Sequence, residues 1–208
     1  MTDADGNDDG ESRDNGGRPS LAERRETPDV YQPAEDSHLL ATAAREEVGA
    51  GERALDVGTG SGYVASALAD AGADVVASDL NPVACRQARE EGVAAVRGDL
   101  LTPFRDSVFD LVTFNPPYLP TPEHREWDDW MERALSGGED GRRLVDPFID
   151  YVERVLTAEG RVFLLVSSLT DVDAVAEYAG TRGLTGETVA EEKHPYERLV
   201  VLRLVPSQ

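Results

Sequence analysis

The sequence of 208 residues predicts an α/β protein: a doubly wound, mostly parallel seven-stranded sheet with an antiparallel last strand. From residue 53 onward, short apolar and β-branched stretches alternate with segments of helical character. The last two apolar stretches have only a short turn between them, so they are expected to pair antiparallel. Strands that are joined by helices are expected to run parallel.

The elements follow in order along the chain. A helix is expected over 38–48, with carboxylates in its first turn as the helix dipole prefers. The expected strands are 54–57, 74–78, 93–96, 109–114, 161–167, 185–191 and 198–205. Further helices are expected up to about 71, then at about 82–91, 141–156 and 171–180. The stretch 119–139 is expected to be a polar connection, in which Trp127 and Trp130 either close over a site or pack as ordinary aromatics.

Composition predicts one folded domain at 28–208 after a disordered acidic tail at 1–27, which has almost nothing to bury. The formal net charge is −21. Such a charge disfavours nucleic-acid partners, which need a basic footprint. It is also typical of adaptation to high salt, and we favour this interpretation because acidic residues are spread along the whole chain while lysine is nearly absent beside arginine.

The single cysteine, Cys85, excludes an internal disulfide and a cysteine-based metal cage. No apolar amino-terminal region and no long apolar run are present, so the protein is expected in a reducing cytoplasm, away from membranes. His38, His124 and His194 have no metal-ligand spacing and are expected to be ordinary surface or rim residues. We therefore expect no metal site.

The strand at 109–114 runs into Asn115-Pro116-Pro117-Tyr118. Two prolines end the strand and stiffen the backbone, so the Asn115 side chain is presented at the strand's carboxyl end, where open α/β sheets bind ligands. The Asn115 amide oxygen and the Pro116 carbonyl both accept hydrogen bonds, and together they suit the two hydrogens of a planar –NH₂ group. The alternative is that these four residues only close a strand.

A glycine loop, 58–62, follows the first strand and opens a helix, which is the setting of a nucleotide-binding loop. The dinucleotide fingerprint requires a glycine or alanine where this chain has Tyr63. The preceding acid, Asp56, would also repel a pyrophosphate. A ligand that carries an ammonium and a sulfonium suits this loop better.

Two more acids end the next strands. Asp79 is placed to hold ribose hydroxyls. Asp99 is placed to bind an adenine amino group, while Leu100 packs on the ring. Together with Asp56, three acids at successive strand ends predict a pocket for S-adenosylmethionine.

With these residues the chain resembles the class I S-adenosylmethionine-dependent methyltransferases, whose fold is Rossmann-like. More narrowly, it is similar to the HemK-type branch, which methylates the side-chain amide of glutamine in translation release factors. The stretches that carry the match are 30–37, 55–62, 114–118 and 137–142. The compact chain is similar to the short archaeal and eukaryotic members.

The resemblance implies a set of site residues and partners. Asn115, Pro116 and Tyr118 are implied to hold and border the substrate. The implied cofactor contacts are Ser37, Asp56, Gly58, Gly60, Asp79, Asp99, Leu100 and Asn115. The implied substrate is the glutamine of the Gly-Gly-Gln motif in a class I release factor, and the implied partner is a small zinc-binding activator subunit at the sheet edge near the third strand.

Other functions stay open at this point. The same two acceptors, the Asn115 amide oxygen and the Pro116 carbonyl, also suit the exocyclic amino groups of adenine or guanine, although the sequence shows no basic face or appended binding domain. Some relatives modify lysine. A cofactor-binding scaffold is disfavoured by Asn115, and an oxidoreductase by Tyr63 and Asp56. Arg142 and Arg143 either meet a substrate backbone or form a salt bridge at a helix start.

Overall fold

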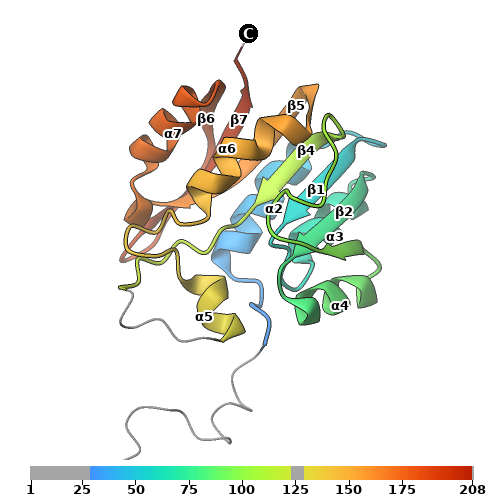
Figure 1. Cartoon of the computed structure of the whole chain (residues 1–208), viewed down its shortest axis with the longest axis horizontal. Coiled ribbons are helices and arrows are strands. Elements are labelled where there is room, and N and C mark those ends of the chain that lie inside the picture. Colours follow the sequence, from blue (N-terminus) through green and yellow to red (C-terminus); the bar gives the residue numbers. More distant parts are fainter. Residues whose placement is uncertain (1–28, 123–128, 208) are drawn as a thin grey trace, which may run out of the picture.

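The computed structural model describes residues 29–122 and 129–207. Within these residues, seven strands form a single mixed sheet (Figure 1). The expected tail at 1–27 lies outside the described residues, as do His124 and Trp127. The strands are β1 (Arg53–Val57), β2 (Asp74–Asp79), β3 (Ala94–Arg97), β4 (Phe109–Phe114), β5 (Leu156–Ser167), β6 (Leu184–Lys193) and β7 (Arg198–Pro206).

The strand order is β3-β2-β1-β4-β5-β7-β6. The first five strands pair parallel with their neighbours. β7 is antiparallel to both β5 and β6, so the predicted fold class is confirmed. The order reverses between β1 and β4, and in a doubly wound sheet the crevice that binds ligands opens at this point, outside the carboxyl ends of the strands.

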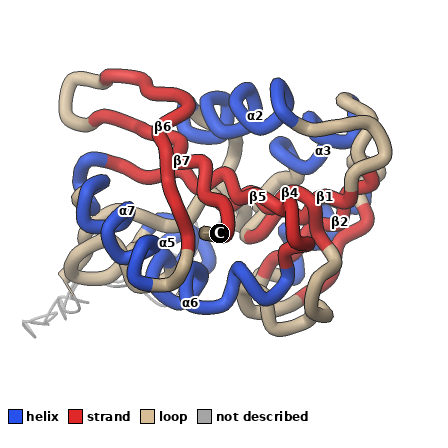
Figure 2. The backbone as a smooth tube through the Cα atoms, turned by 90° about the horizontal axis from the view of Figure 1, so that it is seen from above, coloured by secondary structure: helices blue, strands red, loops and turns tan. Residues whose placement is uncertain are grey.

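Helices cover both faces of the sheet (Figure 2). They are α2 (Glu35–Glu47), α3 (Tyr63–Asp70), α4 (Pro82–Glu90), α5 (Trp130–Leu135), α6 (Val145–Val155) and α7 (Val172–Thr181), with a short 3₁₀ helix at Ser168–Thr170. One apolar core joins the sheet to α2, α3 and α4, and the other joins it to α6 and α7. Each of the described helices is too short or too polar to cross a bilayer.

Three expectations about the elements were wrong. The helix expected from about 141 begins only at Val145, because Gly141 has a φ of +78° and lies in a turn. The fifth strand begins at Leu156, which pairs with Phe109 across a register shift. The connection 119–139 contains α5, whose amino terminus is capped by the Asp129 carboxylate accepting from the Glu132 N–H at 2.8 Å. None of the six α5 residues is buried, so no apolar periodicity indicated this helix.

Candidate active site

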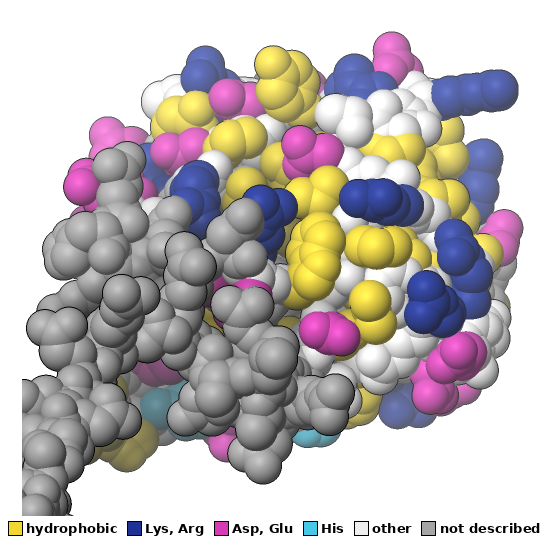
Figure 3. All heavy atoms as spheres, turned by 60° about the horizontal axis from the view of Figure 1, so that its bottom comes forward, with side chains coloured by type: hydrophobic (Ala, Val, Ile, Leu, Met, Phe, Trp, Pro, Cys, Tyr) yellow, Lys and Arg dark blue, Asp and Glu magenta, His cyan; other side chains and the backbone are white. Residues whose placement is uncertain are grey.

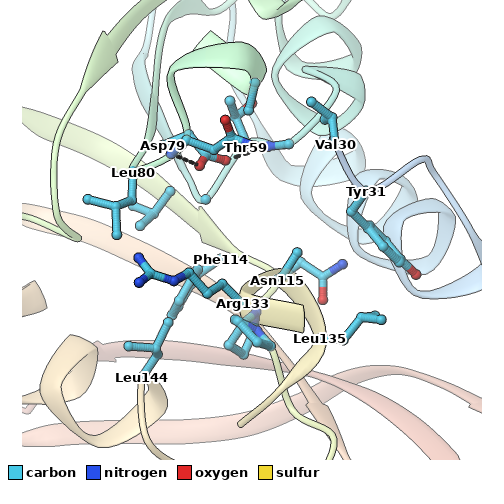
Figure 4. Close-up of a pocket in the computed structure, with 18 of the residues that line it drawn as sticks. Val30, Tyr31, Thr59, Asp79, Leu80, Phe114, Asn115, Arg133, Leu135 and Leu144 are labelled. Carbon is cyan, nitrogen blue, oxygen red and sulfur yellow. Dashed lines mark hydrogen bonds between the residues drawn. The ribbon is translucent and has the colours of Figure 1, made fainter. Parts of the chain in front are cut away.

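A cavity of about 710 Å³ lies at the carboxyl ends of β1, β2 and β4 (Figure 4). All the residues expected to contact substrate or cofactor line it: Ser37, Asp56, Gly58, Gly60, Asp79, Asp99, Leu100, Asn115, Pro116 and Tyr118. They come from five separate parts of the chain. The parallel arrangement brings them together because parallel strands end at the same edge of the sheet.

The glycine loop between β1 and α3 depends on left-handed backbone at Gly58 and Gly62, whose φ angles are +62° and +89°. A Cβ at Gly62 would lie 3.0 Å from the Ala88 Cα, so this glycine lets α3 begin against α4. A Cβ at Gly58 would lie 3.3 Å from the Phe114 ring. The loop is thereby packed tightly between α4 and the end of β4.

The Asp56 side chain is buried beneath this loop, with 2% of the residue exposed. Its two oxygens accept from the hydroxyls of Thr59 at 2.6 Å and Thr113 at 2.8 Å. Burial raises the pKa of Asp56 to about 6, although these hydrogen bonds oppose the shift. A buried carboxylate of this kind favours a cationic ligand, because the cation offsets the cost of its desolvation.

Asp79 joins the end of β2 to the glycine loop. Its carboxylate accepts from the Gly60 N–H at 3.0 Å and from the Asn81 N–H at 2.8 Å. Burial raises the pKa of Asp79, against the effect of these backbone donors. The Asn81 amide in turn donates to the Asp29 carbonyl at 2.7 Å, which ties residues 29–31 to the rim of the cavity.

Asp99 and Leu100 lie at the outer end of the cavity, after β3. Asp99 is exposed, and its carbonyl accepts from the Thr102 N–H and hydroxyl at 3.1 and 2.7 Å. Leu100 is half-buried and adopts a φ of +46°, an uncommon conformation for a residue with a branched side chain. This turn brings both residues to the cavity wall.

Asn115 follows β4 directly and faces the cavity from the side opposite Asp79 (Figure 4). Its Oδ1 atom is buried, and no donor among the described residues reaches it. A buried acceptor without a donor costs about 1–3 kcal/mol. The cost is offset when a ligand supplies an N–H, so the position of this oxygen is suited to gripping an amino group.

Tyr118 forms the wall between the cavity and α2. It is half-buried, and burial raises its pKa. Carboxylates nearby raise the pKa further: those of Asp36, Glu197 and Glu35. Asp36 is held in place by the Tyr31 hydroxyl, which donates to it at 3.1 Å, and the surroundings of Tyr118 are therefore strongly acidic.

The segment after Tyr118 is tied to α5 and to the turn at 137–141. The Leu119 N–H donates to the Leu135 carbonyl at 3.0 Å, and the Leu119 carbonyl accepts from the Gly137 N–H at 2.9 Å. A Cβ at Gly141 would lie 2.5 Å from the Tyr118 carbonyl and would also meet the Thr170 side chain. The glycines of this turn therefore let it pack directly behind the Asn-Pro-Pro-Tyr segment.

Trp130, which was expected either to close over a site or to pack as an ordinary aromatic, lines the cavity from α5, the helix that was not expected. Tyr63, at which the glycine loop departs from the dinucleotide fingerprint, lines it from α3. Arg133 and Leu135 also line it from α5, and they had no signal in the sequence. Tyr31 also lines the cavity. It lies in the stretch 30–37, one of those that carried the family resemblance, and this resemblance was the signal that could have identified it. Arg142 forms the helix-start salt bridge with Asp146 at 3.0 Å, whereas the Arg143 guanidinium donates to the Ser136 carbonyl at 2.8 Å.

The lining fits S-adenosylmethionine. The buried Asp56 carboxylate on β1 and the half-buried Asp79 carboxylate on β2 could supply acceptors for an ammonium group and for hydroxyls, and could offset the positive charge of a sulfonium. The Asn115 oxygen, which no donor among the described residues reaches, lies across the cavity from Asp79. The chemistry of this donor set matches a cationic amino acid joined to a nucleoside.

Comparison with known proteins agrees with this geometry. Residues 55–117 match a family described as a methyltransferase domain. Over 182 residues the chain is 35% identical to a putative protein N5-glutamine methyltransferase of Methanocaldococcus jannaschii, with 84% of this chain and 91% of that protein covered. It is 33% identical to the methyltransferase HEMK2 of Homo sapiens over 194 residues, with 86% and 91% covered.

A solved structure from E. cuniculi shares the fold. It is the Mtq2–Trm112 complex, described as responsible for methylating the translation termination factor eRF1. The TM-score is 0.72 at 30% identity, and the alignment covers 86% of this chain and 100% of that one. The chain belongs to the HemK-type protein N5-glutamine methyltransferases, a branch of the class I S-adenosylmethionine-dependent methyltransferases.

Proposed function

We propose that the protein transfers a methyl group from S-adenosylmethionine to the side-chain amide nitrogen of a glutamine, the one in the Gly-Gly-Gln motif of a class I release factor. The observation that carries this proposal is the buried Asn115 oxygen, which has no donor among the described residues and faces the cofactor pocket. The relatives named for glutamine methylation support the choice of target.

The reaction requires an amide nitrogen, a poor nucleophile, to be aimed at an electrophilic carbon. S-adenosylmethionine supplies that carbon as the methyl group of its sulfonium. The Asn115 oxygen and the Pro116 carbonyl accept the two hydrogens of the target –NH₂, which orients its lone pair and favours positive charge on the nitrogen. Orientation of this kind is worth about 7–11 kcal/mol. Tyr118 borders the amide, and proton loss follows transfer.

The acidic surroundings of Tyr118 argue against nucleic-acid substrates. Glu35, Asp36 and Glu197 are close enough to raise its pKa, so a phosphate backbone near the acceptor site would be repelled. The same carboxylates favour cationic acceptors. A protein lysine is therefore the second candidate substrate.

We further propose that the active protein pairs with a small zinc-binding activator subunit, as Mtq2 is paired with Trm112 in its solved complex. The edge strand β3 is the proposed docking site, since three of its four residues are exposed, Val96 among them. We place the activity in a single domain, 28–208, which acts in the cytoplasm where release factors work.

Incubation with activator, release factor and methyl-labelled S-adenosylmethionine tests the proposal. The label is expected on the Gly-Gly-Gln peptide of the factor. Asn115→Ala is expected to keep cofactor affinity within about twofold while turnover falls about 10²–10³-fold, the usual cost of losing one aligned polar group at the reacting centre. Label on DNA, RNA or a lysine instead of the factor's glutamine would refute the assigned substrate. Unchanged turnover in Asn115→Ala would refute the role of Asn115.

A further inference from the structure

Tyr63 is the residue at which the glycine loop departs from the dinucleotide fingerprint, and the structure gives it a partner. It is the first residue of α3, it lines the cofactor cavity, and 36% of it is exposed. Its hydroxyl lies 2.6 Å from the Nδ1 atom of His38 on α2. The two rings meet edge to face, with centroids 4.8 Å apart. The pair thus links the starts of α2 and α3, which lie side by side on one face of the sheet (Figure 2).

The pair lies at the end of the cavity away from Asp79 and Asp99, the two carboxylates assigned to the ribose and adenine of the cofactor. His38 follows Ser37, and Tyr63 follows the loop that covers Asp56, so the pair borders the part of the pocket that β1 and α2 build. Asp79 and Asp99 lie after β2 and β3, toward the sheet edge. The amino-acid portion of the cofactor belongs at the β1 end, where Asp56 suits its ammonium group.

An amino acid also carries a carboxylate, which requires O–H or N–H donors. Three hydroxyls at this end already donate to carboxylates: Ser37 to Asp36 at 3.2 Å, Tyr31 to Asp36 at 3.1 Å, and Thr59 to Asp56 at 2.6 Å. A carboxylate oxygen can only accept hydrogen bonds, so these acids offer the ligand's carboxylate no donor. The Tyr63 hydroxyl is a donor of the required kind on the cavity wall.

We propose that His38 and Tyr63 form a clasp that recognises the carboxylate of the cofactor. His38 donates its Nδ1–H to the phenolic oxygen, and the Tyr63 O–H is thereby turned toward the pocket, where it donates to the carboxylate. The clasp rests on S-adenosylmethionine being the methyl donor of the proposed function, and it deepens that function by assigning a specificity residue.

Two ligands separate carboxylate recognition from simple packing. Decarboxylated S-adenosylmethionine keeps the adenosine, the sulfonium and the amine and lacks only the carboxylate. Dissociation constants for both ligands are measured by calorimetry. Tyr63→Phe is expected to weaken S-adenosylmethionine about tenfold, the effect of one hydrogen bond to a charged group, and to change the decarboxylated ligand less than about twofold.

Variants of His38 test the second half of the clasp. His38→Ala is expected to weaken S-adenosylmethionine about fivefold, whereas His38→Asn, which carries an N–H donor near the Nδ1 position, restores most of the affinity. Tyr151→Phe is the matched control for Tyr63→Phe, because Tyr151 is 61% exposed on α6, on the other face of the sheet, and its loss of a hydroxyl should leave both dissociation constants unchanged. All variants should keep the melting temperature of the unliganded protein.

Two outcomes overturn the clasp alone. If Tyr63→Phe weakens the binding of both ligands equally, the pair only packs against the ligand and does not recognise its carboxylate. If Tyr63→Phe changes neither dissociation constant, the pair takes no part in ligand binding. If the unsubstituted protein binds neither ligand, the methyl donor itself is wrong, and the proposed function fails with it.

Discussion

At the scale of single residues, the site is a set of polar groups held in costly environments. Asp56 is buried under the glycine loop, and Asn115 keeps a buried oxygen without a donor among the described residues. Each group costs free energy in the unliganded protein and returns it when a ligand of the right chemistry arrives. Such local costs mark a functional site because packing alone would select apolar residues at these positions.

The raised pKa of Asp56 predicts that both the stability of the fold and the binding of a cationic ligand depend on pH. Its pKa of about 6 lies above the ordinary value of 3.8, so the folded protein holds this proton more tightly than the unfolded chain does. A pKa difference of about two units corresponds to about 3 kcal/mol. The protonated Asp56 side chain therefore stabilises the folded protein by about this amount below about pH 4, and this stabilisation is lost as the pH rises through about 6.

The ionised form of Asp56 attracts a cationic ligand. The affinity for S-adenosylmethionine, measured by calorimetry from pH 5 to pH 8, is therefore expected to rise through about pH 6 and then level off. Asp56→Asn should bind more weakly and show a smaller slope, since the Asp56 carboxylate is gone while Asp79, whose pKa is also raised, remains. An affinity that stays constant over this range in the unsubstituted protein would contradict a charge pairing at Asp56.

At the scale of elements, the site depends on turns that place strand ends against helices. The turn at 137–141 packs behind Tyr118, and Leu119 hydrogen-bonds both to it and to α5. The edge strand β3, which pairs with β2, presents exposed side chains at one edge of the sheet. Both features can be tested by single substitutions with matched controls.

Gly141→Ala is expected to destabilise the protein by about 3 kcal/mol or more, because the added Cβ meets the Tyr118 carbonyl and the Thr170 side chain in left-handed backbone. Gly92→Ala has a similar φ of +86° but nothing within 4 Å of the added Cβ, so it should cost only about 1–2 kcal/mol. Urea unfolding measures both. Equal costs would mean that the contact behind Tyr118 relaxes freely.

Val96→Asp on β3 is expected to weaken association with the activator subunit at least about tenfold, because it places a charge in the proposed interface. Val189→Asp is the control: both valines are 37% exposed, and Val189 lies on β6 at the opposite edge of the sheet. Co-purification and calorimetry measure the association. A larger loss in Val189→Asp would move the interface to the other edge.

At the scale of the whole molecule, a net charge of −21 acts on a chain of 208 residues. Figure 3 shows the face that forms the bottom of Figure 1, where hydrophobic side chains gather near the centre among charged ones. Like charges repel over the Debye length, which is about 8 Å at physiological ionic strength and about 3 Å at 1 M salt. Self-repulsion therefore weakens in concentrated salt.

The free energy of unfolding is accordingly expected to rise between 0.1 and 2 M KCl, with most of the gain below about 1 M, where the Debye length changes most. Urea titrations at a series of KCl concentrations measure this. A free energy that is the same at both ends of the series would show that the acidic surface costs the folded state little.

Much of this molecule is determined by sequence alone, because local chemistry acts over short distances. Alternating apolar stretches predicted the seven strands, the two prolines after Asn115 ended β4, and Asn81-Pro82 opened α4, where the Asn81 side chain caps the helix. The acids at the ends of β1 and β2 could be assigned to one pocket because parallel strands end at a common edge.

Only the tertiary structure decided the features that join distant segments. α5 buries no residue and is held by its cap and by Leu119, so its sequence carries no period to detect. The pairing of His38 with Tyr63 spans 25 positions and depends on how α2 packs against α3. The sequence by itself determined the chemistry at each strand end, whereas packing between helices decided which side chains close the pocket, since contacts of that kind depend on the whole chain being folded.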